Sequence, residues 1–212
     1  PWLRDNQHHL FIIAAGSSIG SLLRNNITPD AVVLLERNQG VYELFTELLV
    51  EGHTLKPIDL FACSTVDPRI PGLFNKHYLY HRPFSASASL FHSEIDSCLA
   101  IAGPQVINST LEIALRLGFR NLLLFGCDFG AFDKTYPRSR SSLGVDLDFS
   151  SRSMQIPVKG NLGRTVFSSE DLLASKMLFE RTVSSYPGLK LSRCGMGADF
   201  DSITVDEYDS PD

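Results

Sequence analysis

Short runs of mostly apolar residues recur along the chain, and several are followed by a small or polar turn. The clearest runs, with the length of strands, lie at 10–15, 31–35, 58–63 and 121–125. Weaker ones lie at 77–81 and 189–193. Strands that are apolar throughout are buried on both faces of a sheet. The pattern therefore predicts a sheet that is covered on both sides rather than one with a solvated face.

Between these runs the apolar residues change to helical spacing. Helices are predicted at about 18–25, around the apolar face of Tyr42, Phe45, Leu48 and Leu49, at 105–117 and at 168–186. Strands that alternate with helices imply parallel pairing through right-handed crossovers. We therefore predict an α/β fold with a Rossmann-like open, mostly parallel sheet and helices on both faces.

Two stretches interrupt this alternation. Residues 82–104 are rich in Ser and Ala, and residues 134–165 form a Ser/Arg-rich segment with no clear period. The second segment is predicted to be a long basic loop, and loops of that length usually act as lids or are disordered. We expect one domain over 1–198, followed by an acidic C-terminal tail over 199–212.

Charge and cysteine content narrow the class of protein. The chain of 212 residues has a net charge of −5, and its last 14 residues hold six acids and no Lys or Arg. The rest of the chain is therefore near neutral, which argues against binding to nucleic acid or membrane surfaces. The four cysteines have no CxxC or metal-ligand spacing, so no metal site is predicted and a reducing cytoplasm is expected.

Polar or glycine-rich turns follow three of the predicted strands. In open α/β sheets ligands bind beyond the carboxyl ends of the strands. The candidates at these ends are Gly16, Ser17 and Ser18, then Glu36 and Asn38, and finally Asp128 with Asp133 beyond it. Turn geometry and helix capping can explain each of them singly. Their coincidence at one edge favours a ligand site, with Asp128 and Asp133 as its catalytic acids.

Asp128 has two interpretations that the sequence leaves open. Its carboxylate can serve as a base or as a ligand for ribose or metal, with a pKa that its surroundings shift. Alternatively, it can cap the loop 129–132 by accepting backbone N–H groups, as Asp commonly does in turns.

A second group of candidates could hold an anion. Gly103 and Pro104 open the helix at 105–117, whose free N–H groups would suit a phosphate, and Asn108 lies in its first turn. Arg138 and Arg140 belong to the basic loop, which could receive an anionic substrate. A solvated, bystander loop is the alternative.

Several stretches together resemble a known family. They are "AAGSSIGSLLRNNITPDAVVLLERNQGVYELF" at 14–45, "GPQVINSTLEIALRLGFRNLLLFGCDFGAFD" at 103–133, "KGNLGRTVFSS" at 159–169 and "GMGADFDSI" at 195–203. In this order they resemble the central domain of the bacterial motility-associated factor (Maf) flagellin glycosyltransferases. That domain is similar to bacterial sialyltransferases and to archaeal 6-hydroxymethylpterin diphosphokinases, which share the stretch 111–130.

The resemblance implies an activity and a set of partners. It implies transfer of a CMP-activated nonulosonic acid, of the pseudaminic or legionaminic type, to Ser or Thr of flagellin in support of motility. Asn161 joins the substrate-binding candidates on this basis. No cofactor is expected beyond the nucleotide-sugar donor, and a need for a divalent metal is left open. The alternatives are a 6-hydroxymethylpterin diphosphokinase, which uses ATP and Mg²⁺, and a non-catalytic scaffold that binds flagellin or a chaperone.

The resemblance also predicts a feature of the sheet. The family's first strand and its glycine-rich "GxGPSL" turn would lie just before Pro1. We therefore expect an open edge beside the strand at 10–15. Because open edges invite pairing with another chain, we expect a homodimer, or an N-terminal extension from a neighbouring copy at this edge.

Overall fold

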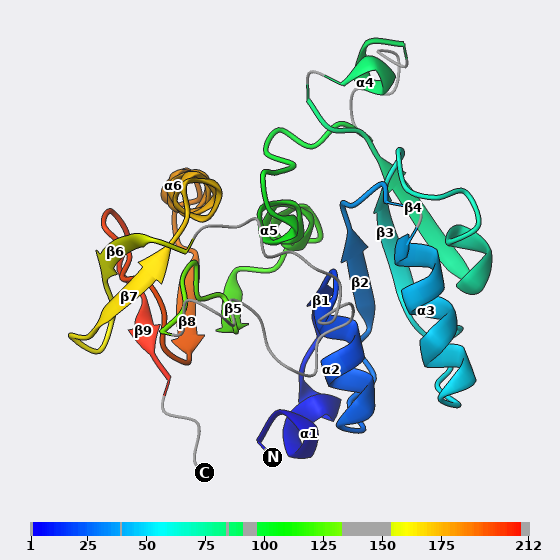
Figure 1. Cartoon of the computed structure of the whole chain (residues 1–212), viewed down its shortest axis with the longest axis horizontal. Coiled ribbons are helices and arrows are strands. Elements are labelled where there is room, and N and C mark those ends of the chain that lie inside the picture. Colours follow the sequence, from blue (N-terminus) through cyan, green and yellow to red (C-terminus); the bar gives the residue numbers. More distant parts are fainter. Residues whose placement is uncertain (1, 39, 84, 91–96, 133–153, 209–212) are drawn as a thin grey trace.

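The computed structural model describes residues 2–38, 40–83, 85–90, 97–132 and 154–208. Its first sheet consists of four parallel strands in the order β1-β2-β3-β4 (Figure 1). These strands are β1 (Ile13–Ala15), β2 (Ala31–Leu34), β3 (Asp59–Cys63) and β4 (Lys76–Tyr80). The apolar runs of the sequence therefore become strands, and β2 is buried along its whole length.

A second, three-stranded parallel sheet follows in the order β5-β8-β9. Its strands are β5 (Asn121–Phe125), β8 (Lys190–Cys194) and β9 (Asp206–Glu207). An antiparallel hairpin of β6 (Ile156–Lys159) and β7 (Thr165–Ser168) lies beside this sheet (Figure 1). The isolated bridge between Gly160 and Ala198 joins the hairpin to the segment that follows β8.

Helices connect and cover the strands. The longer ones are α2 (Ser18–Arg24), α3 (Gly40–Val50), α5 (Val106–Arg116) and α6 (Glu170–Ser184). The shorter ones are α1 (Trp2–Asn6), α4 (Ala86–Leu90) and the 3-10 turns η1 (Gln7–His9) and η2 (Pro71–Leu73). Helix α6 begins with a side-chain cap, because Ser169 Oγ accepts a hydrogen bond from the backbone N–H of Leu172 at 3.4 Å.

Helix α5 joins two hydrophobic cores. It packs against β1 and β2 on one side and against α6 on the other (Figure 1). Ile113 belongs to the core of the first sheet, whereas Leu111 and Leu115 belong to the core of the second. As a result every residue from Asn108 to Leu115 is buried. The burial of this helix therefore extends beyond one apolar face.

The predicted open, mostly parallel α/β architecture of Rossmann-like type is confirmed, with one difference. Its parallel strands form two sheets rather than one, so β5 is an edge strand. The sequence predicts β5 to be covered on both faces, and that prediction is wrong: Leu122, Leu123 and Leu124 are half-buried and Phe125 is 40% exposed. Within the described residues β1 pairs with β2 alone, as the open edge expected beside 10–15 requires.

Two predicted segments are placed differently from the expectation. Residues 199–208, set apart as an acidic tail, pack on the second sheet: β9 pairs with β8, and Phe200 joins its core. The predicted loop at 134–165 contains β6, and residues 133–153 of that region lie outside the described residues. Among the described residues, no helix is long and apolar enough to cross a membrane.

Candidate active site

Asp128 stands just beyond the end of β5, as the sequence predicts. The chain leaves the strand through Gly126, which has a φ of +64°, and passes Phe129 at a φ of +47°. Cys127 and Phe129 on either side are buried in the second core. Because both neighbours are anchored, the position of Asp128 at the sheet's end is fixed.

The carboxylate of Asp128 is partly buried at the end of β5. Within the described residues no donor reaches it. Burial raises its pKa to about 6, and the positive charge of Arg193 only partly opposes this effect. The same burial, together with the charge of Asp128, raises the pKa of the Cys127 thiol. A carboxylate of this kind is ionised at neutral pH and can accept a proton.

The backbone of Asp128 packs against a glycine turn that follows β8. Its carbonyl oxygen accepts a hydrogen bond from the backbone N–H of Ala198 at 2.7 Å. A Cβ atom at Gly197 would lie 2.5 Å from the Cα of Asp128, which is closer than real side chains approach. Gly195 has a φ of +114°, a conformation that favours glycine. The turn 195–197 therefore needs glycines at both ends to reach Asp128.

Asn161, in the turn between β6 and β7, holds this glycine turn in place. Its Nδ2 donates to the carbonyl of Gly195 at 3.1 Å and to a carboxylate oxygen of Glu207 at 2.9 Å. Its Oδ1 accepts the N–H of Gly197 at 3.0 Å. Its backbone N–H donates to the carbonyl of Gly197 at 3.1 Å. Asn161 thus lies at the turn beside Asp128, and its hydrogen bonds hold the backbone of that turn in position.

Arg193 is the buried cation of this site. Its guanidinium donates to the carbonyl of Ala198 and to a carboxylate oxygen of Glu207, both at 2.8 Å. It also lies over the ring of Phe200, 4.9 Å from the centroid. Within the described residues its Nε is buried without a hydrogen-bond partner. A fixed positive charge therefore lies under the turn that contacts Asp128.

The capping interpretation of Asp128 is wrong. The carboxylate accepts no N–H from residues 129–132, and its contacts to the loop run through the backbone instead. The interpretation as a base or ligand site remains a prediction, now with a raised pKa in its favour.

The candidates of the first sheet gather around the start of α5. The N–H of Gly16 donates to the carbonyl of Val33 at 2.9 Å, and a Cβ at Gly16 would lie 3.3 Å from the Val106 side chain. Ser17 and Ser18 lead from this turn into α2. Gly103 approaches Arg82 so closely that an added Cβ would lie 3.0 Å from the guanidinium. The turn after β1 and the segment with Gly103 and Pro104 thus converge on one helix start.

Other predicted residues have structural roles or lie elsewhere. Asn108 is buried between α5 and α6: its Nδ2 donates to the carbonyl of Ser175 at 2.9 Å, and its Oδ1 accepts the Ser175 hydroxyl at 2.5 Å. The prediction that it faces a ligand is therefore corrected. Asn38 accepts the N–H of Gly40 at the start of α3, and Glu36 is exposed. Asp133, Arg138 and Arg140 lie outside the described residues.

The candidates do not share the edge of one sheet. Gly16 and Glu36 follow β1 and β2 of the first sheet, whereas Asp128 follows β5 of the second. Sequence reasoning missed Arg193 and Arg82. A charged residue at the end of the predicted strand 189–193 was a signal for Arg193. In the described part of the chain, no group of three or more His, Cys, Asp or Glu residues is placed to hold a metal ion.

Comparison with known proteins gives two matches. The family model described as 6-hydroxymethylpterin diphosphokinase MptE-like matches residues 1–134. The structure of a Maf glycosyltransferase from Magnetospirillum magneticum AMB-1 is similar over 98% of this chain, with 30% identity and a TM-score of 0.80. This chain spans 30% of the length of that protein. None of the curated proteins matches. By the match over residues 1–134, the chain belongs to the 6-hydroxymethylpterin diphosphokinase MptE-like family.

Proposed function

We propose that this chain is a glycosyltransferase-type domain that transfers a CMP-activated nonulosonic acid to Ser or Thr hydroxyls of flagellin. The observation that carries the proposal is the similarity to a Maf glycosyltransferase over 98% of the chain, at a TM-score of 0.80. At 30% identity, this similarity extends beyond the fold to the sequence. The donor sugar and the acceptor are part of the proposal.

Asp128 is the general base in this proposal. With a pKa of about 6 it is ionised at neutral pH, yet close enough to neutrality to take up a proton during reaction. It takes the proton from the acceptor hydroxyl as that oxygen forms a bond to the anomeric carbon of the sugar. The bond from this carbon to the phosphate oxygen breaks, and CMP leaves. Among the described residues no donor bonds to the carboxylate, which supports this role.

The segment around the start of α5 is proposed to hold the nucleotide. Gly16 and Gly103 bring backbone close to this helix start, and Arg82 lies beside Gly103. Backbone N–H groups and a guanidinium suit the phosphate of a CMP-sugar. The acidic residue Asp133 and the basic residues Arg138 and Arg140 remain candidates for catalysis and for donor binding.

A pterin diphosphokinase is the second candidate, and one observation favours it. The family model that matches residues 1–134 is described by that activity. This reaction uses ATP and Mg²⁺, so it differs from the first candidate in its nucleotide and in its need for a divalent ion.

Ligand-dependent thermal unfolding separates the candidates, because a ligand that binds only the folded state raises the melting temperature. The protein is heated with CMP, CTP, ATP with Mg²⁺, or a pterin. Stabilisation that is selective for CMP supports the glycosyltransferase. A response that requires ATP and Mg²⁺ supports the diphosphokinase instead, and no response to any of them contradicts both and favours the scaffold.

A further inference from the structure

Glu112 is a buried carboxylate on α5 to which the proposed reaction gives no role. It is 4% exposed, and its two oxygens accept neighbouring backbone N–H groups from the segment before the helix, that of Ala100 at 2.8 Å and that of Ile101 at 2.6 Å. Arg116, one turn later, balances its charge at 2.9 Å and donates to the carbonyl of Cys98 at 2.7 Å. The two side chains therefore attach this segment to α5.

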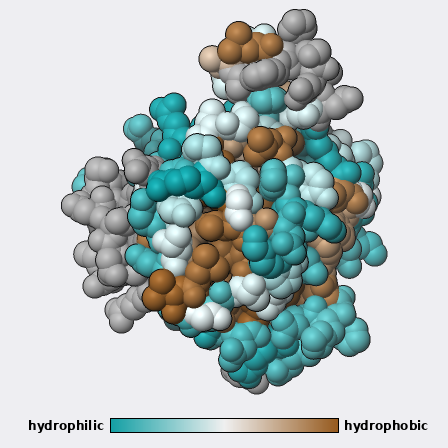
Figure 2. All heavy atoms as spheres, turned by 90° about the vertical axis from the view of Figure 1, so that its right-hand side faces the viewer, coloured by the Kyte–Doolittle hydropathy of each residue, from teal (hydrophilic) through white to brown (hydrophobic). Residues whose placement is uncertain are grey.

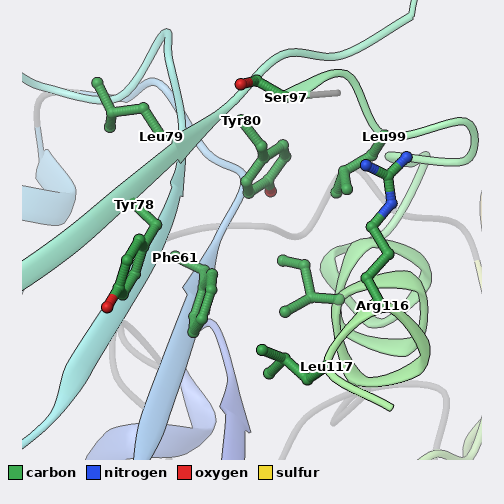
Figure 3. Close-up of a pocket in the computed structure, with 9 residues that line it drawn as sticks. Phe61, Tyr78, Leu79, Tyr80, Ser97, Leu99, Arg116 and Leu117 are labelled. Carbon is green, nitrogen blue, oxygen red and sulfur yellow. The ribbon is translucent and has the colours of Figure 1, made fainter. Parts of the chain in front are cut away.

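Packing supports only part of this segment. Leu99 is buried and its N–H donates to the carbonyl of His81 at 3.1 Å, but Ala100 is exposed and Ile101 is half-buried. On the side of β4, apolar atoms remain exposed in a band (Figure 2), and Leu99 lines a pocket of about 190 Å³ between β4 and α5 (Figure 3). Because burial does not fix the two peptide groups after Leu99, their bonds to Glu112 determine where they lie.

The segment continues directly into the backbone that orients Arg82. The carbonyl of Ala102 accepts the N–H of Arg82 Nε at 3.1 Å, and an added Cβ at Gly103 would lie 3.0 Å from Arg82 Nη2. Since a guanidinium is planar, a bond at Nε fixes the plane of its remaining N–H groups. Ala102 follows Ile101, whose N–H is held by Glu112. The orientation of the Arg82 guanidinium therefore depends on the Glu112 carboxylate.

We infer that Glu112 is a positioning residue for the donor site, on the basis of the proposed function in which Arg82 binds the phosphate of the nucleotide sugar. A guanidinium contact to phosphate is directional, because its paired N–H groups must meet two phosphate oxygens. Glu112 itself contacts no substrate in this arrangement. It holds the backbone that keeps Arg82 turned toward the phosphate.

Glu112→Gln tests this role with almost no change in shape. Its amide NH2 group would replace one oxygen and face a backbone N–H, so one bond is lost and two donors oppose each other. Glu180→Gln on α6 is the matched control, because Glu180 is also 4% exposed, pairs with a basic residue one turn away and accepts the neighbouring N–H groups of Asp201 and Ser202. Both variants should lower the melting temperature, but only Glu112→Gln should affect Arg82.

Calorimetric titration with CMP measures the consequence for phosphate binding. Glu112→Gln should raise the dissociation constant at least tenfold, and Glu180→Gln should leave it unchanged. Arg82→Ala should raise it at least as much, and adding Glu112→Gln to Arg82→Ala should cause no further rise, because a contact made by Arg82 cannot be lost twice. Arg116→Gln, at a side chain that is 41% exposed, is a milder second variant that should raise the constant about threefold. An unchanged constant in Glu112→Gln overturns the positioning role, as does a further tenfold rise in the double variant.

Exchange of the Arg82 Nε–H proton with solvent, followed by NMR, tests the positioning without any nucleotide. This proton should exchange at least tenfold faster in Glu112→Gln than in the unchanged protein, and at the same rate in Glu180→Gln. An unchanged rate in Glu112→Gln overturns the role of Glu112, whatever the protein binds. Faster exchange in a protein that binds no CMP would support the hold of Glu112 on Arg82 and contradict the proposed function instead.

Discussion

Asp128→Asn should make the protein more stable at neutral pH but not at pH 4. The folded state holds the Asp128 carboxyl with a pKa of about 6, against an ordinary value of 3.8, because burial disfavours its charge. Between these two values the folded protein binds more protons than the unfolded chain, so stability falls as the pH rises through this window. Asparagine has the same shape and no charge to bury, so the stability of the variant does not fall as the pH rises through this window.

The size of the effect follows from the shift in pKa. Each pKa unit corresponds to about 1.4 kcal/mol, so a rise from 3.8 to about 6 costs the folded state at most about 3 kcal/mol once the carboxyl is ionised. The stability of the variant relative to the unchanged protein should therefore grow by about 2–3 kcal/mol between pH 4 and pH 7.

Urea unfolding at half-unit steps from pH 4 to pH 8 measures this difference directly. Asp199→Asn is the matched control, because the hydrogen bond from Lys159 at 2.6 Å lowers the pKa of Asp199. Because the folded and unfolded pKa values of Asp199 both lie at or below 3.8, its replacement should leave the stability difference nearly constant above pH 5. The free energy of unfolding of Asp128→Asn relative to the unchanged protein should rise with pH. If this difference is constant with pH, or shrinks above pH 6, the Asp128 carboxyl is not buried as described.

Three further changes test the surroundings of the site. Gly197→Ala should destabilise the protein by at least about 2 kcal/mol in urea unfolding, because its Cβ would overlap the backbone of Asp128, whereas Gly72→Ala, with no atom within 4 Å, should be neutral within about 0.5 kcal/mol. Asn161→Ala should lower the free energy of unfolding by about 1–3 kcal/mol and speed hydrogen exchange of the Gly197 amide, which bonds to Asn161. Unchanged exchange would contradict the role of Asn161 in holding the glycine turn. Asn108→Ala should lower stability by a similar amount while nucleotide affinity of the folded protein stays the same; a loss of affinity alone would restore it as a ligand residue.

Local pattern was enough to predict most of the fold. Each apolar run became a strand, and the helical spacing around Phe45 and Leu48 placed α3 correctly. Pairing between distant segments was not predictable in the same way. The apolar composition of β5 indicated a central strand, but its neighbours in the sheet, β8 alone among the described strands, decide its burial.

The same division applies to the candidate site. The position of Asp128 followed from the end of a strand, which is a local feature. Its pKa is raised by burial, and the glycine turn at 195–197 that packs against it is more than 60 residues away in the sequence. Arg193, whose positive charge partly opposes this rise, is equally distant. Asn108 was misplaced for the related reason that its partner, Ser175, is 67 residues distant and no local pattern reveals it.

Transfer of the sugar is the most direct test of the proposed function. The protein is incubated with a CMP-activated nonulosonic acid and unmodified flagellin, and the flagellin is analysed by mass spectrometry. The account predicts added sugar on Ser or Thr, loss of transfer in Asp128→Asn, and retention of transfer in Asp199→Asn. Transfer that persists in a folded Asp128→Asn variant would contradict the role of this carboxylate. A folded protein that leaves flagellin unmodified but converts a hydroxymethylpterin with ATP and Mg²⁺ would contradict the proposed activity itself.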